Sequence, residues 1–133
     1  MAFTPSPRFA AAIERFDALN AQDPNDKELT YARRMTGWLE KLAPDASEPL
    51  RLAARSQHLM RWHIPRESFP KDRIGYLKWR TMLYDFHADK AAEVLREVGY
   101  DDATVARARS LIRKERLKVD PEMQLLEDVI CLV

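Results

Sequence analysis

The sequence is poor in the residues and runs that define several classes of protein. Only three of its 133 residues are glycine, and Cys131 is the single cysteine. One cysteine excludes an intramolecular disulfide and a cysteine-cluster metal site. No apolar stretch reaches the roughly 18 residues of a membrane-spanning helix, and the N-terminus has no signal-peptide pattern. We therefore expect a single domain over residues 1–133 that is cytoplasmic and has no membrane partner.

Charge is balanced over the whole chain but unevenly distributed along it. The net charge is +1, so there is no general electrostatic attraction to nucleic acid. Residues 51–80, which we name the basic segment, hold eight Lys or Arg against two acids. The same segment holds two of the three tryptophans and two of the three histidines. This composition is typical of an anion-binding or catalytic surface.

Helix signals predict an all-α fold, a single compact bundle of about six helices. N-cap residues and prolines in first turns precede apolar stripes of helical period. The predicted helices span residues 7–19, 26–42, 47–62, 72–98, 102–114 and 121 onward. Gly99 fits the left-handed position that ends a helix. The last helix stops at Val133 inside an apolar run, so we expect the chain to be truncated at its C-terminus.

Two histidines and two acids are candidate metal ligands. His58 falls on the predicted third helix. His87 lies on a stripe of the fourth helix whose other members are Tyr76, Arg80, Leu83, Ala91, Val94 and Val98. Either ring binds a divalent metal or bonds a neighbouring carbonyl. Glu28 is a further ligand or an ordinary acid of a helix N-terminus. Asp128, within an apolar helix, predicts a partly buried carboxylate that needs an arginine, a histidine or a metal as partner.

A cluster of arginines and tryptophans predicts a binding site for an anionic small molecule. Guanidinium groups bind phosphate or carboxylate through two parallel hydrogen bonds and stack on aromatic faces. The candidate binding residues are Arg61, Arg66, Arg73, Arg80, Trp62 and Trp79. Three alternatives stay open: a solvated helix face, tryptophans that belong to the core, or arginines that pair with acids of the same chain. A second basic stretch, residues 107–118, is spread around the fifth helix and predicts solvated surface.

Several motifs together resemble one family across nearly the whole chain. They are Gln57-His58-Leu-Met-Arg61-Trp62-His63-Ile-Pro65-Arg66, Pro70-x-x-Arg73-x-Gly75-Tyr76-Leu-x-Trp79-Arg80, His87, Gly99-Tyr100-Asp101, Arg113-Lys114 and Asp120-Pro121-Glu122-x-Gln124-x-Leu126-Glu127-Asp128. This set resembles an uncharacterised family of bacteria and fungi, a domain of unknown function sometimes labelled glutamyl-tRNA synthetase-like. The sequence has no nucleotide-binding signature to match that label. Members of that family are longer at the C-terminus. The resemblance therefore implies that this chain is cut short there.

The order of acids and histidines also resembles HD-type metal phosphohydrolases. These are all-helical enzymes that bind a divalent metal through a histidine, a His-Asp pair and a distal aspartate. The resemblance places Glu28 at the first histidine, Gln57-His58 at the pair and Asp128 at the distal aspartate. Glu28 and Gln57 depart from that pattern, and glutamine is a poor ligand for divalent metals, although Glu, His and Asp together form a competent mixed site.

Two hypotheses for function follow from the sequence. The first is an HD-like, metal-dependent hydrolase of a phosphorylated small molecule or nucleotide, with His58 and Asp128 as catalytic residues and a divalent metal as cofactor. Its metal ligands would be His58, His87, Asp128 and Glu28. The alternative is a non-enzymatic helical module that binds an anion or RNA.

Overall fold

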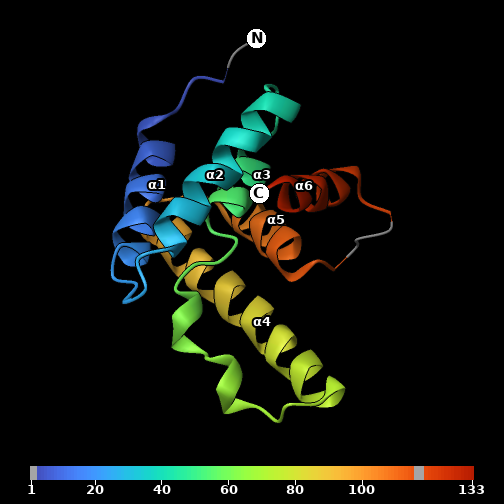
Figure 1. Ribbon diagram of the computed structural model, residues 1–133. Coiled ribbons are helices and arrows are strands. Elements are labelled where there is room, and N and C mark those ends of the chain that lie inside the picture. Colours follow the sequence, from blue (N-terminus) through green and yellow to red (C-terminus); the bar gives the residue numbers. More distant parts are fainter. Residues whose placement is uncertain (1–2, 116–118) are drawn as a thin grey trace.

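The computed structural model describes residues 3–115 and 119–133 (Figure 1). These residues form six α-helices, two short 3-10 helices and no strand, which confirms the all-α prediction. The elements are α1 (Pro7–Asn20), α2 (Glu28–Leu42), α3 (Glu48–Arg55), η1 (Arg61–His63), η2 (Arg66–Ser68), α4 (Arg73–Glu97), α5 (Asp102–Arg113) and α6 (Pro121–Leu132). None of the described helices is long and apolar enough to cross a membrane.

The helix starts follow from the capping residues that the sequence indicates. The Ser6 hydroxyl accepts from the backbone N–H of Phe9 at 3.1 Å, and Ser47 caps α3 in the same way. Asp72 and Asp120 cap α4 and α6. Each side-chain oxygen satisfies an N–H that the helix itself leaves free. Gly99, with φ of 97°, ends α4 in the left-handed conformation that favours glycine.

The predicted third helix is seven residues too long, because α3 ends at Arg55 and residues 56–60 form a turn. The Ser56 hydroxyl donates to the Leu52 carbonyl at 2.8 Å and competes with helix continuation. The side chain of Asn20, on α1, accepts from the Met60 N–H at 3.0 Å. Met60 itself is left-handed, with φ of 55°. Contacts from distant parts of the chain therefore end this helix, and His58 lies in the turn.

The core surrounds α3, which packs against α1, α2, α5 and α6, while α4 lies along α5. Fully buried side chains come from every helix of this bundle, including Phe16, Met35, Leu52, Leu95 and Leu126. Figure 1 shows that the N-terminal half of α4 leaves the bundle together with η1 and η2. We name residues 61–82 the arm.

Within the arm, residues 61–72 are fastened to the first turns of α4. The Trp79 indole N–H donates to the Ile64 carbonyl at 2.7 Å. Gly75 lies directly against Pro70, so a Cβ built there would be 2.1 Å from the Pro70 carbonyl oxygen. Arg66 donates to that same carbonyl at 2.9 Å. These contacts hold the arm together, the continuous helix α4 joins it to the bundle, and a cavity lies where the arm and the bundle meet.

Candidate functional site

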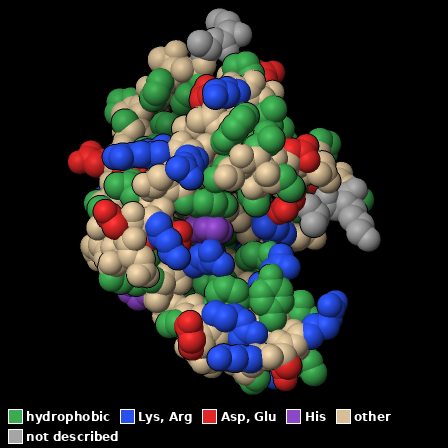
Figure 2. All heavy atoms as spheres, viewed as in Figure 1, with side chains coloured by type: hydrophobic (Ala, Val, Ile, Leu, Met, Phe, Trp, Pro, Cys, Tyr) green, Lys and Arg blue, Asp and Glu red, His purple; other side chains and the backbone are tan. Residues whose placement is uncertain are grey.

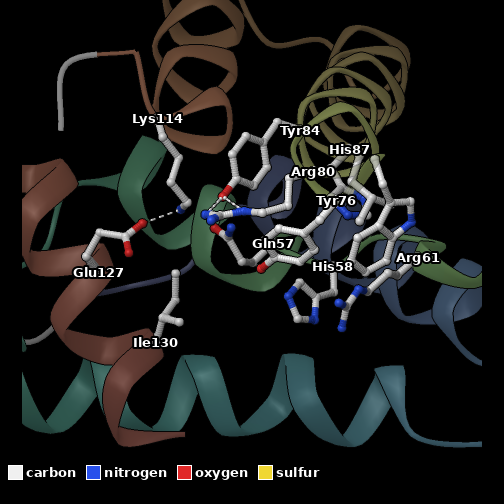
Figure 3. Close-up of a pocket in the computed structure, with 12 residues that line it drawn as sticks. Gln57, His58, Arg61, Tyr76, Arg80, Tyr84, His87, Lys114, Glu127 and Ile130 are labelled. Carbon is white, nitrogen blue, oxygen red and sulfur yellow. Dashed lines mark hydrogen bonds and ion pairs between the residues drawn. The ribbon is translucent and has the colours of Figure 1, made fainter. Parts of the chain in front are cut away.

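A cavity of about 270 Å³ lies where α4, residues 57–61, the end of α5 and α6 come together. We name it the cationic pocket. Figure 2 shows a histidine side chain in a hollow of this face, with Lys and Arg side chains beside it. The polar residues that line the pocket include Gln57, His58, Arg61, Arg80, His87 and Lys114 (Figure 3).

One side of α4 forms a wall of the pocket. Tyr76, Arg80, Tyr84 and His87 recur every three or four residues, which puts them on one face of the helix. Arg80 donates to the Tyr84 hydroxyl through Nη2 and through Nε, the latter at 3.1 Å. Its guanidinium also lies 5.7 Å from the ring centroid of Tyr76 and 5.4 Å from that of Tyr84. The two tyrosines thus hold the guanidinium in the pocket.

His87 is a neutral, buried histidine with one nitrogen already bonded. Its Nδ1 lies 2.8 Å from the Leu59 carbonyl oxygen. Because a carbonyl only accepts, Nδ1 carries the hydrogen and Nε2 keeps its lone pair. Burial lowers the pKa of His87 to about 3, although the bond to Leu59 opposes the effect. Of the two roles expected for this histidine, metal binding or a bond to a neighbouring carbonyl, Nδ1 of His87 takes the second.

His58 lies between the pocket and a buried glutamate. Its Nδ1 is 3.7 Å from the Glu28 carboxylate, whose side chain is 6% exposed. The imidazole stacks on the Tyr31 ring, with centroids 3.9 Å apart and planes 5° from parallel. Burial lowers the pKa of His58, and Glu28 partly opposes this. Burial also raises the pKa of Tyr31 to about 12, so its hydroxyl stays protonated.

The charged side chains that line the cationic pocket are three cations, Arg61, Arg80 and Lys114, and one carboxylate, Glu127. The Arg61 guanidinium lies 5.3 Å from the ring centroid of Trp79, and in the described residues neither Arg61 nor Arg80 has a carboxylate partner. Lys114 ends α5 in a left-handed conformation, and its ammonium pairs with Glu127 at 2.7 Å. Burial lowers the pKa of Lys114. The pocket therefore carries excess positive charge.

The structure brings together about half of the residues that the sequence singled out. His58, Arg61, Trp79, Arg80 and His87 line the cationic pocket. The first members of the stripe predicted on α4, Tyr76, Arg80, Leu83 and His87, line the pocket, whereas Ala91 and Val94 lie in the core.

The other predicted binding residues lie nearby or on the surface. Trp62 and Arg66 line an adjacent cavity of about 410 Å³, which shares Arg61 and Trp79 with the cationic pocket. Arg73, at the start of α4, is exposed. His63 is exposed.

The prediction of a partly buried Asp128 is wrong. Asp128 is exposed, and its Oδ1 accepts from the Gln124 amide at 3.0 Å. The inward face of α6 carries Met123, Leu126 and Val129, and position 128 falls on the opposite side of that helix. Asp128 does not line the cationic pocket with His58.

The candidate metal ligands do not form a coordination shell in this arrangement. Residues 3–115 and 119–133 contain no group of three or more His, Cys, Asp and Glu side chains placed to hold a metal ion. Glu28, His58 and His87 lie in a row, with the two imidazole centroids 6.1 Å apart. A divalent metal stays a prediction, and we derive no chemical step through one.

Other arginines of the two basic stretches pair with acids of the same chain. Arg55 forms two bonds to the Asp17 carboxylate, and Arg51 pairs with Glu40. In the second stretch, Arg107 binds both Asp120 and Glu122. Internal pairing therefore accounts for part of the basic segment but not for Arg61 and Arg80.

Sequence reasoning put Tyr76 on the stripe of His87 and Gln57 beside His58, but it gave neither of them a binding role. It missed three residues of the pocket: Tyr84, Lys114 and Glu127. Tyr84 follows Arg80 by one helical turn, and that spacing is a usable signal. Lys114 was predicted as solvated, but its side chain is only 10% exposed. Its place depends on how α5 and α6 pack, which spacing along α5 does not reveal. Arg116 and Lys118 of the same stretch lie outside the described residues.

Comparison with known proteins identifies the family. Residues 10–133 match the family described as Domain of unknown function (DUF4202). The match spans nearly the whole chain, which therefore belongs to this family, and the first resemblance is confirmed. No curated protein and no solved structure matches the chain. The resemblance to HD-type phosphohydrolases stays a prediction.

Proposed function

We propose that this member of the DUF4202 family binds the phosphate group of a small phosphorylated molecule in the cationic pocket. One observation carries the proposal. Arg61 and Arg80 line the same cavity as Lys114, yet no carboxylate of the described chain pairs with either arginine. A phosphate there would accept hydrogen bonds from two guanidinium groups and an ammonium.

The way in which the two arginines are held supports this argument. Half of the described arginines outside the pocket have an acidic partner, namely Arg15, Arg51, Arg55, Arg107, Arg109 and Arg113. Arg61 and Arg80 are held by aromatic rings instead, which fix the position of each guanidinium and leave its charge uncompensated. Such positioning lowers the ordering cost when an anion binds.

The geometry favours a small ligand over RNA. Proteins that bind single strands without sequence preference present open aromatic faces on which bases stack. Here guanidinium groups already lie over Trp79, Tyr76 and Tyr84. A cavity of about 270 Å³ is also at the small end of ligand pockets. RNA binding stays a prediction, which a steep loss of affinity with salt would support.

A metal-dependent hydrolase is the second hypothesis, and the structure supports it less well. The same cations would hold the phosphate of a substrate. However, Asp128 lies outside the pocket, and the described residues offer no group of three metal donors. We therefore give binding, without an assigned reaction, as the function.

The test is calorimetric titration of the protein with inorganic phosphate in a low-salt buffer without phosphate. Arg80→Gln should weaken binding at least about tenfold, because one charge-assisted hydrogen bond contributes about 1.5–3 kcal/mol. Arg96→Gln is the matched control, since Arg96 lies on the same helix, is exposed and lines no part of the pocket. Absence of phosphate binding, or equal losses in both variants, would contradict the proposal. Binding that requires added Zn²⁺ or Mg²⁺ would favour the metal hypothesis instead.

A further inference from the structure

We propose that the ligand is a phosphate ester of a small polyhydroxylated molecule, of the sugar-phosphate class. The phosphate binds the three cations, and hydroxyl groups of the same molecule donate to Gln57 and His87. The inference rests on the proposed function and adds the chemistry of the part of the ligand that is not phosphate.

Gln57 is a buried acceptor without a donor. Gln57 is 3% exposed and lines the cationic pocket. Its Oε1 has no hydrogen-bond partner within the described parts of the chain. Figure 3 shows its carboxamide among the labelled residues, beside Arg80 and Tyr84. A buried polar atom left unpaired costs about 1–3 kcal/mol. A ligand that donates a hydrogen bond to this oxygen would remove that cost.

His87 supplies a second acceptor to the same cavity. Its Nδ1–H is bonded to the Leu59 carbonyl, so the ring nitrogen that remains is Nε2 with its lone pair. The imidazole is 2% exposed and stays neutral at physiological pH. The pocket therefore combines positively charged donors with two neutral acceptors, Gln57 Oε1 and His87 Nε2.

The surrounding charge decides which kind of donor suits those acceptors. An ammonium group on the ligand would be repelled by Arg61, Arg80 and Lys114, which line the same 270 Å³. A hydroxyl group donates without charge. The aromatic faces of the pocket are already covered by guanidinium groups, which disfavours a nucleobase. A phosphate monoester with neighbouring hydroxyl groups carries no ammonium group, donates through neutral hydroxyl groups and contains no nucleobase.

The test compares two phosphate esters that differ only in their hydroxyl groups. Glycerol 3-phosphate and propyl phosphate have the same carbon chain and the same phosphate group. Titrated into the full chain at fixed pH and salt, glycerol 3-phosphate should bind about tenfold more tightly, because one added hydrogen bond contributes about 1 kcal/mol or slightly more. In Gln57→Leu the two esters should bind within about twofold of each other.

Each outcome bears on one of the two proposals. Equal affinity of the wild type for both esters overturns the hydroxyl inference while phosphate binding stands. Failure of inorganic phosphate and both esters to bind overturns the proposed function. An unchanged preference in Gln57→Leu overturns the role of Gln57, and Gln57→Met gives the same readout if the leucine variant does not fold. Tighter binding of 3-aminopropyl phosphate than of glycerol 3-phosphate would show that the donor is an ammonium group.

Discussion

Acid should destabilise this protein through His87, whose ring stays neutral in the folded state. The ordinary pKa of histidine is about 6.5, and burial lowers that of His87 to about 3. Between these values the unfolded chain binds a proton at this position and the folded chain does not. The contribution of the neutral His87 ring to the free energy of unfolding is therefore fully present above about pH 6.5. It is lost progressively as the pH falls toward 3. His58, whose pKa is also lowered, acts in the same direction.

The magnitude follows from the linkage between protonation and folding. Each pH unit below the unfolded pKa costs about 1.4 kcal/mol, so His87 alone should lower the free energy of unfolding by roughly 2 kcal/mol between pH 8 and pH 5. Nearby positive charges on Arg61 and Lys114 strengthen the preference for the neutral ring. Hydrogen bonding to Leu59 weakens it without reversing it.

Urea unfolding at pH 8 and pH 5, followed by circular dichroism, measures this loss. His87→Gln removes the titrating group and keeps an N–H that can donate to the Leu59 carbonyl. The variant should be less stable than the wild type at pH 8, and that difference should shrink by about 2 kcal/mol at pH 5. His63→Gln, at an exposed histidine, should follow the wild type at both pH values. If His87→Gln loses as much stability as the wild type on acidification, the neutral buried ring is refuted.

Three further predictions concern the arm, the turn at residues 56–60 and the ligand. Gly75→Ala forces a methyl group against a backbone carbonyl 2.1 Å away and should lower the free energy of unfolding by about 1–3 kcal/mol, whereas Gly37→Ala, in open space on α2, should raise it by about 0.5–1 kcal/mol. Asn20→Ala leaves the buried N–H of Met60 without its acceptor and should cost about 1–3 kcal/mol in urea unfolding as well as weaken phosphate binding; an effect no larger than that of Asn25→Ala would argue against this role. Inorganic phosphate at 100 times its Kd should stabilise the protein by about 2.7 kcal/mol, and an unchanged Tm at that concentration would contradict binding to the folded state.

The starts of the helices could be predicted from sequence because capping is local. Ser6, Ser47, Asp72 and Asp120 each bond an N–H two or three residues away, so the pattern that indicates the cap also contains its partner. The end of α3 could not be predicted in this way. It depends on the bond from the Met60 N–H to Asn20, two residues that lie 40 positions apart along the chain.

The candidate site was predictable only where its residues share one helix. The spacing of Arg80 and His87 put them on one face of α4, and the structure confirms that face as a pocket wall. Lys114 and Asp128 were misplaced because their surroundings depend on packing between helices. Lys114 was expected in solvent and is enclosed, whereas Asp128 was expected to be partly buried and is exposed.

The continuous course of α4 determines which parts of the pocket can diverge. The C-terminal half of this helix buries Ala88, Ala91 and Ala92 in the core, and the preceding turns carry the pocket wall. A rigid helix ties the two halves together, so a shift of the wall would disturb the packing of the bundle. Residues 57–60 belong to no helix, and the bonds from Met60 to Asn20 and from His87 to Leu59 hold them instead. We expect changes of ligand preference within the family to arise in this turn, while the α4 wall stays constant.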